Sequence, residues 1–128
     1  MRVYNKWHFT IKQALKELNL THPQFVILAS LAYLSQHDNE VTQVMISKLS
    51  GIDVMTVSQI LSLLEKRGFV ERKEPSRVTR AKTVLLIEGG AILQKAVPLV
   101  EEIDEIFFGK LKSDEAQFKH LLGRLHEA

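Results

Sequence analysis

A nearly uncharged stretch in the first third of the chain constrains the fold most. Residues 25–34 read FVILASLAYL, and the longer segment 19–37 contains no Asp, Glu, Lys or Arg. Thr21 and Gln24 form the Thr-x-x-Gln pattern of a capping box, and Pro23 suits a first helical turn. The predicted helix begins at Thr21, ends near residue 35 and is apolar on most sides. Because this apolar run is too short to span a bilayer, we expect the helix to be the buried axis of the domain.

Two further helices are predicted directly after this apolar segment. A polar break at residues 37–40 is followed by Thr42, which is placed to be the N-cap of a short helix over residues 42–49. Ser50 and Gly51 end that helix. Asp53 is the predicted N-cap of the next one, which covers residues 54–67 and stops where Gly68 follows it. The sequence therefore predicts two helices joined by a tight turn.

The remaining elements make the chain mainly α-helical with one β-hairpin. Apolar residues recur at near-helical spacing over residues 5–18, which predicts an N-terminal helix. Two runs of β-formers, 69–73 and 83–87, predict two strands joined by a turn. A long helix over residues 90–108 and a last helix from about residue 113 complete the order. We expect residues 1–128 to be one domain, with a core at about 21–90 and outer helices at about 5–18 and 90–127.

Residues 66–82, KRGFVERKEPSRVTRAK, form a basic ribbon. Seven Lys or Arg less two Glu give it a net charge of +5, whereas the whole chain is only +2. Such a ribbon suits a polyanionic partner, because Lys and Arg displace the counterions that condense on a phosphate backbone. A solvated charged hairpin is the alternative that composition alone leaves open.

The order helix, tight turn, helix, basic hairpin is typical of a winged helix-turn-helix DNA-binding module. The second helix has an apolar face at positions i, i+3, i+4 and i+7 (Val57, Ile60, Leu61, Leu64) that would attach it to the domain. Its opposite face is polar or small, as contacts with base edges require, although a merely solvent-facing helix has the same pattern. The predicted groove-facing residues are Thr42, Gln43, Val54, Met55, Thr56, Ser58 and Gln59. The predicted phosphate or minor-groove contacts are Lys66, Lys73, Ser76, Arg77, Arg80 and Lys82.

Three segments resemble the MarR (multiple antibiotic resistance regulator) family of bacterial transcription factors. They are LTHPQFVILASL at residues 20–31, VTQVMISKLSGIDVMTVSQILSLLEKRGFVERK at 41–73, and RAKTVLL at 80–86. The part LEKRGFVER, at residues 64–72, is the most specific. The resemblance implies a winged helix-turn-helix homodimer with interlocked terminal helices and a two-fold operator near a regulated promoter. It often implies a small ligand, such as a phenolic compound, whose binding releases the DNA. The family expectation places this ligand in a cavity between the dimer helices and the DNA-binding lobe.

The chain departs from this family pattern at two places. The family's wing commonly carries Asp-x-Arg, whereas here Val78 precedes Thr79 and Arg80, so that ion pair cannot form and a looser wing is expected. The family's Leu-Thr-x-Lys-Gly motif after the second wing strand reads LIEGG at residues 86–90. The threonine N-cap of the long helix is therefore missing, a loss of about 1 kcal/mol.

The terminal helices predict a dimer independently of the family. They carry more large apolar side chains than a winged module of about 70 residues can cover, so a second copy is the expected cover. A two-fold dimer would place two recognition helices about 34 Å apart, or a multiple of that distance. The alternative is a satellite bundle within one chain. The predicted dimerisation residues are Trp7, Ile11, Leu15, Ile103, Ile106, Phe107, Phe118, Leu121, Leu122 and Leu125.

Other function classes find little support in the sequence. The absence of cysteine excludes a disulfide framework, a thiolate nucleophile and a cysteine-based zinc site. The histidines form no i, i+4 pair, so no metal site is expected, and no catalytic arrangement can be assembled, so we expect neither an enzyme nor a cofactor. No signal peptide or membrane segment is recognised, and we expect a cytoplasmic protein. The alternative function is a winged-helix protein-interaction or architectural DNA-binding module without a ligand response.

Overall fold

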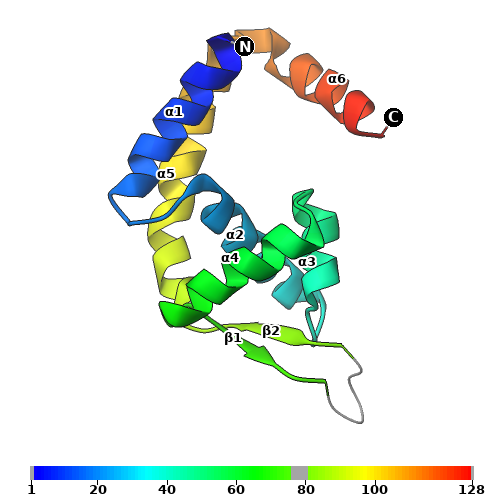
Figure 1. Ribbon diagram of the computed structural model, residues 1–128. Helices are drawn as coiled ribbons and strands as arrows, with labels where there is room; N and C mark the ends of the chain where they lie inside the picture. Colours follow the sequence, from blue (N-terminus) through cyan, green and yellow to red (C-terminus); the bar gives the residue numbers. More distant parts are fainter. Residues whose placement is uncertain (1, 76–80, 128) are drawn as a thin grey trace.

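The computed structural model describes residues 2–75 and 81–127, and over these ranges the predicted order of elements is confirmed (Figure 1). The chain is mainly helical with one small antiparallel sheet. The elements are α1 (Arg2–Lys16), α2 (His22–His37), α3 (Gln43–Ser50), α4 (Val54–Lys66), β1 (Val70–Lys73), β2 (Thr83–Leu86), α5 (Gly89–Gly109), the 3-10 helix η1 (Lys112–Asp114) and α6 (Glu115–Glu127).

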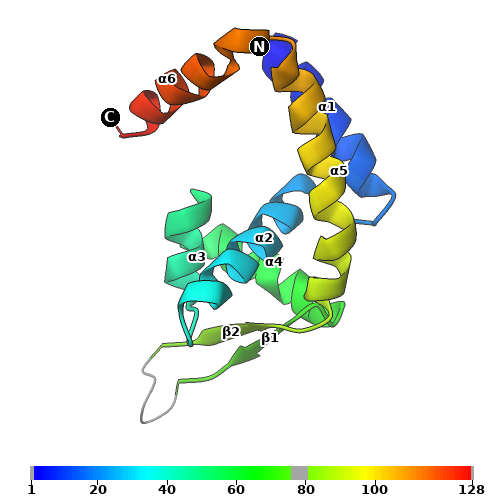
Figure 2. The same cartoon turned by 180° about the vertical axis from the view of Figure 1, so that it is seen from behind.

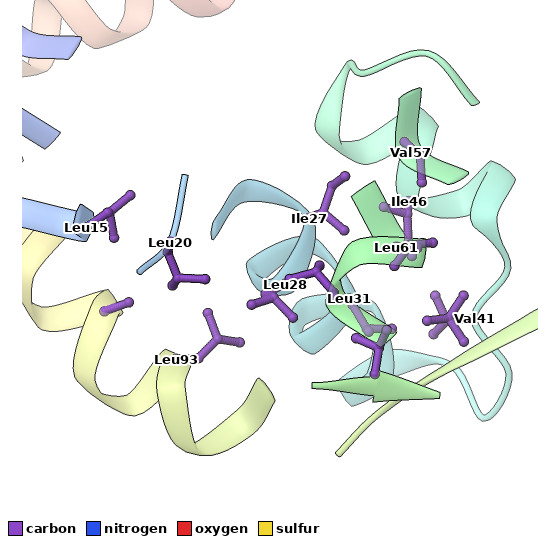
Figure 3. Packing of buried hydrophobic residues seen from close by; sticks show 14 of the residues in the cluster. Leu15, Leu20, Ile27, Leu28, Leu31, Val41, Ile46, Val57, Leu61 and Leu93 are labelled. Carbon is purple, nitrogen blue, oxygen red and sulfur yellow. The ribbon is translucent and has the colours of Figure 1, made fainter. Parts of the chain in front are cut away.

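The apolar helix α2 is the axis of the core, as predicted. Its capping box is formed, because the Thr21 hydroxyl accepts from the Gln24 amide over 3.2 Å and the Gln24 side chain accepts from the Thr21 amide over 3.1 Å. The helix packs against α1, α3, α4, α5 and β2. Leu28 and Leu31 are completely buried, and Figure 3 shows the apolar side chains of the surrounding elements gathered around them. This core holds α1, α3, α4, α5 and β2 in place.

The turn between α3 and α4 is formed by helix caps and a glycine that the sequence predicts. Thr42 and Asp53 are the N-caps of the two helices, and Gly51 ends α3 with a left-handed φ of 76° that glycine adopts without strain. The Ser47 hydroxyl donates to the Ile52 carbonyl over 2.6 Å and closes the turn. The chain turns by 111° between the two helices, within the range of about 90–120° that is usual for a helix-turn-helix.

The hairpin joins the C-terminal end of α4 to the start of α5. Its strands pair in a register from Val70 opposite Leu86 to Lys73 opposite Thr83. An isolated bridge between Thr42 and Thr83, with the Val84 amide donating to the Val41 carbonyl over 2.8 Å, ties β2 to the loop before α3. The end of the hairpin at Lys73 and Thr83 therefore lies on the same side of the molecule as α3 (Figures 1 and 2).

The terminal helices form an arm that leads away from this lobe. Helices α1 and α5 run side by side in opposite directions, and the Trp7 indole donates to the Asp104 carboxylate between them over 2.8 Å. Helix α6 extends from the top of that pair, clear of α2, α3 and α4 in both views (Figures 1 and 2). At the other end of α5, its N-cap Glu88 makes no side-chain capping bond among the described residues, which agrees with the missing threonine cap. In the part of the chain that the structure describes, no single helix is long and apolar enough to cross a bilayer.

Candidate nucleic-acid interface

The N-terminal half of α4 presents the face that the sequence assigns to the DNA groove. Met55 is 72% exposed and Val54 42% exposed, and the Gln59 side chain is exposed one turn further along. Thr56 and Ser58 are half-buried at the edges of this face. On the reverse side of the helix, Val57, Leu61 and Leu64 are completely buried in the core, and Ile60 is half-buried against it. Helix α4 thus has the two faces that a recognition helix needs.

The cap of α4 sets what one of these residues can offer to a base. The Asp53 carboxylate accepts from the Thr56 hydroxyl over 2.6 Å and from the Thr56 amide over 3.1 Å. These two hydrogen bonds lower the pKa of Asp53, so the cap is ionised at neutral pH. Because its proton is directed at Asp53, the Thr56 hydroxyl has only its oxygen lone pairs left for a partner, and it can accept from an amino group of adenine or cytosine.

The start of α3 lies beside the hairpin and contributes two predicted groove residues. The Thr42 hydroxyl accepts from the Met45 amide over 3.2 Å, so its oxygen is engaged as the helix cap and the hydroxyl proton remains available. Gln43 is half-buried, and its side-chain oxygen lies 3.4 Å from a nitrogen of Arg72. Thr42 is therefore held by its role as the helix cap, and Gln43 is held by its contact with Arg72.

The basic ribbon is only partly available to a polyanion. Lys66, Lys73 and Lys82 are exposed, and Lys82 lies 4.0 Å from Glu74, an exposed pair of the kind that contributes little energy. Ser76, Arg77, Val78, Thr79 and Arg80 lie outside the described residues. The predicted roles of the ribbon residues at 76–80 therefore remain predictions.

Two arginines of the ribbon are engaged by other parts of the protein: Arg72 is half-buried, whereas Arg67 is exposed but hydrogen-bonded to the chain. Arg67 donates to the Asn19 carbonyl over 2.6 Å, and its guanidinium lies 4.6 Å over the Phe69 ring. Arg72 is bound to α4 through Glu65, with 3.1 Å between Nη2 and Oε1. The structural role of Arg72 was not predicted, although the alternation of β1 contains the signal: Val70 is buried, Glu71 exposed, Arg72 half-buried and Lys73 exposed.

The predicted dimerisation residues divide into an exposed group and an internal group. The exposed apolar side chains are Ile106 (63%), Phe118 (37%), Leu121 (45%), Leu122 (45%) and Leu125 (75%), whereas Trp7, Ile103 and Phe107 are half-buried. Ile11 and Leu15 are completely buried within one chain, because the antiparallel partner α5 and the core cover them. They leave no surface for a second chain, so their assignment to a dimer interface is corrected to the monomer core.

A groove runs between α2 and α5 on the face where the winged lobe meets the arm. It has a volume of about 690 Å³ and its walls are mostly apolar. Tyr33 and Gln36 of α2, Leu86 of β2, and Gly90 and Val97 of α5 are among the residues that line it. The groove therefore lies between the core helix α2, the strand β2 of the hairpin and α5, the long helix of the arm.

Two histidines that are far apart in sequence meet where α1 faces the start of α2. The Nδ1 atoms of His8 and His22 lie 3.2 Å apart, and the Trp7 ring meets His22 edge-on. Burial and the charge of His8 lower the pKa of His22, while Asp104 opposes that shift. Spacing along one helix could not reveal a pair formed between two helices. Within the described ranges, no group of three or more His, Cys, Asp or Glu side chains is arranged to hold a metal ion.

Comparison with known proteins agrees with this architecture. Residues 16–104 match the family described as ArnR1-like, winged-helix domain. The uncharacterized HTH-type transcriptional regulator YdcH of Bacillus subtilis is 38% identical over 110 residues, which cover 85% of this chain and 75% of that protein. A mutant MarR from E. coli complexed with operator DNA is 27% identical, with a TM-score of 0.81 and coverage of 97% of this chain and 88% of that one. Bordetella bronchiseptica BpsR, whose DNA binding is regulated by 6-hydroxynicotinic acid, is 26% identical with a TM-score of 0.85, covering 99% and 89%.

Proposed function

Because the chain belongs to the MarR family of winged-helix transcriptional regulators, we propose that it is a homodimeric repressor that a small ligand releases from a two-fold operator. The observation that carries this proposal is the exposed N-terminal half of α4, with Met55 and Gln59 outward, beside a hairpin that bears exposed lysines. An exposed helix face that combines polar and apolar side chains, with positive charge at its flank, suits the major groove of duplex DNA.

The DNA contacts that we propose follow from the exposed positions of α4, α3 and the hairpin. Val54 and Met55 would make apolar contacts, and Thr56, Ser58 and Gln59 would form hydrogen bonds with base edges. Exposed lysines at the end of α4 and along the hairpin would hold phosphates and fix the orientation of the helix in the groove. Ser76, Arg77 and Arg80 complete the proposed set on sequence grounds alone.

The homodimer that we propose would bury the exposed apolar side chains of α5 and α6. Leu121, Leu122 and Leu125 lie on a helix that extends away from the rest of its own chain (Figures 1 and 2). Such a row is costly to leave in water, and a two-fold pairing of two identical chains would cover it on both. The same symmetry would present two α4 helices to one face of the DNA, about 34 Å apart.

The ligand that we propose is a small aromatic or phenolic effector bound in the groove between α2 and α5. Apolar walls with a few polar groups, here Tyr33 and Gln36, suit a flat aromatic ring that carries a hydroxyl or carboxylate. The likeness to BpsR supports this class of compound, because 6-hydroxynicotinic acid regulates DNA binding by that protein. A ligand that contacts both α2 and α5 could shift the winged lobe relative to the arm.

Selection from a random pool of duplexes tests the proposal. We expect the full chain to select a two-fold sequence, to bind it with two chains per duplex, and to block transcription from a promoter that overlaps it. Adding 6-hydroxynicotinic acid and related hydroxylated aromatic carboxylates, one at a time, should release the duplex for at least one of them. Selection of an asymmetric site by a single chain would refute the dimer. Release by none of these compounds would refute the proposed ligand class.

A further inference from the structure

Arg72 forms a hydrogen-bonded junction between the hairpin and both helices of the helix-turn-helix. Its Nε and Nη2 donate to Glu65 Oε1 over 3.2 and 3.1 Å, and Nη2 also donates to Ser62 Oγ over 2.9 Å. Its Nη1 lies 3.4 Å from Gln43 Oε1 and 3.5 Å from the Ser58 carbonyl oxygen. The side chain is 21% exposed. One residue of β1 therefore touches three residues of α4 and the first residue of α3.

The backbone of the same residue strengthens this junction. The Arg72 amide donates to Glu65 Oε2 over 3.1 Å, so the two oxygens of one carboxylate bind the main chain and the side chain of Arg72. These hydrogen bonds lower the pKa of Glu65, so the carboxylate is ionised at neutral pH. A guanidinium is planar and its donors have fixed directions, so it transmits orientation as well as charge. The position of β1 along α4 is thereby fixed.

The junction also sets the orientation of Gln43. A guanidinium can only donate, so the amide oxygen of Gln43 must face Arg72. The amide NH2 group is then the part of this side chain that is left for an outside partner. A donor at this position can bind the N7 or O6 atoms of guanine, the N7 atom of adenine or a phosphate oxygen.

We propose that Arg72 is a positioning residue for sequence recognition, which holds α4, Gln43 and the hairpin in the arrangement that fits the groove. This inference rests on the DNA-contact surface proposed above. Although Arg72 belongs to the basic ribbon, it has no phosphate-binding role in this arrangement, because reaching a phosphate would require it to leave Glu65 and Ser62. The consequence of losing Arg72 is therefore a loss of discrimination between sequences, rather than a uniform loss of affinity.

The test compares Arg72→Met, Arg72→Lys and the strand neighbour Lys73→Met at several salt concentrations. Each variant is titrated with the duplex that the wild-type chain selects and with a scrambled duplex of the same length. We expect both Arg72 variants to lower the ratio of the two affinities about tenfold, since lysine keeps the charge but not the planar set of donors. The salt slope, which is the slope of the logarithm of the binding constant against the logarithm of salt concentration, should stay unchanged on the scrambled duplex. Lys73→Met should instead reduce the salt slope by about one unit and keep the ratio.

Glu65→Gln gives a second, milder test, in which the affinity for both duplexes should rise while the ratio of the two affinities should fall. Removing a negative charge near the DNA should by itself strengthen binding to both duplexes. Loss of the Arg72 junction should nevertheless lower the affinity ratio, by less than the Arg72 variants do. Combining Glu65→Gln with Arg72→Met should lower the ratio no further than Arg72→Met alone, since both changes break one junction. Urea unfolding of each variant verifies that it is folded under the binding conditions.

Two outcomes would overturn the inference. A salt slope that falls by about one unit in Arg72→Met and is restored in Arg72→Lys would make Arg72 a phosphate contact. An unchanged affinity ratio in folded Arg72→Met and Glu65→Gln would leave the junction a purely structural role. If the wild-type chain itself fails to distinguish the two duplexes, the proposed function fails together with this inference. A selective wild type with an unaffected ratio in the variants refutes the inference alone.

Discussion

Adding a single methyl group to Gly89 should destabilise the fold, whereas the same change at Gly90 should not. Gly89 is buried where β2 passes into α5. A Cβ atom there would lie 2.8 Å from Leu86 Cδ1, 2.8 Å from the Phe69 carbonyl oxygen and 2.9 Å from Leu28 Cδ2. Real Cβ atoms essentially never come this close to another heavy atom, so something must shift. The neighbours decide how much that shift costs.

Two of the three neighbours of Gly89 cannot move without a large cost in free energy. The Phe69 carbonyl accepts from the amides of Ile87 and Gly89, each over 3.0 Å, so moving it would weaken two hydrogen bonds. Leu28 is completely buried in the core. Overpacking of this kind costs about 1–3 kcal/mol, and the upper half of that range applies where backbone must move. An alanine in a helix regains at most about 1 kcal/mol over glycine. We therefore expect Gly89→Ala to lower the free energy of unfolding by about 1–2 kcal/mol.

Gly90→Ala is the matched control, since it is the same substitution one residue further along α5. The nearest atom to its Cβ would be Leu86 Cδ2 at 3.8 Å, an ordinary contact. This variant should gain about 0.5 kcal/mol from the lower entropy of its unfolded chain. Urea unfolding at one fixed protein concentration measures both, because dimerisation would otherwise shift the midpoint. A Gly89→Ala protein as stable as Gly90→Ala would refute the argument from packing at this junction.

Three further predictions concern recognition, pH and assembly. Gln59→Ala should change which base is preferred at one position of the selected duplex, and sequencing of duplexes selected by the variant checks this; equal weakening on all duplexes would remove Gln59 from the reading face. Burial and the charge of His8 lower the pKa of His22 below 6.5, so the unfolded chain binds this proton at a higher pH than the folded chain does. The free energy of unfolding should therefore decrease below about pH 6.5, and more steeply than in His22→Gln. Urea midpoints measured across that pH range check this. Leu121→Glu combined with Leu122→Glu should convert dimers into folded monomers in light scattering, and unchanged dimers would refute a contact at this face.

The parts of the fold that could be predicted are those that short stretches of sequence determine. Thr21, Thr42 and Asp53 each announce a helix start because their side chains bind an amide three residues later, and all three bonds are present. Gly51 and Gly68 announce helix ends, and both have the left-handed φ that favours glycine. The likeness to the MarR family, first inferred from the segments around these residues, is confirmed by the comparisons.

The features that could not be predicted depend on which surfaces come together in space. Ile11 and Leu15 have the spacing of any apolar helix face, and that spacing does not say whether a partner chain or the chain's own α5 covers it. The meeting of His8 and His22 depends on how α1 packs against α2. Arg72 counts toward the net charge of the basic ribbon, but its position two residues after buried Val70 puts it on the inner side of β1. Composition gives the net charge of a segment, but which of its charged side chains face solvent depends on how the strands and helices pack together.

If a ligand binds in the proposed groove between α2 and α5, the connections of the hairpin link it to the proposed DNA-contact surface. Arg72 ties β1 to α4, and the pairing of Thr83 with Thr42 ties β2 to the loop before α3. At the opposite end of the hairpin, Leu86 lines the groove and lies against the position where a Cβ on Gly89 would sit. A ligand that displaces Leu86 would therefore push on a hairpin whose two strands are attached to the two helices of the helix-turn-helix. Because the packing around Gly89 leaves no space for a methyl group, such a push would be passed along the strands rather than absorbed at the start of α5.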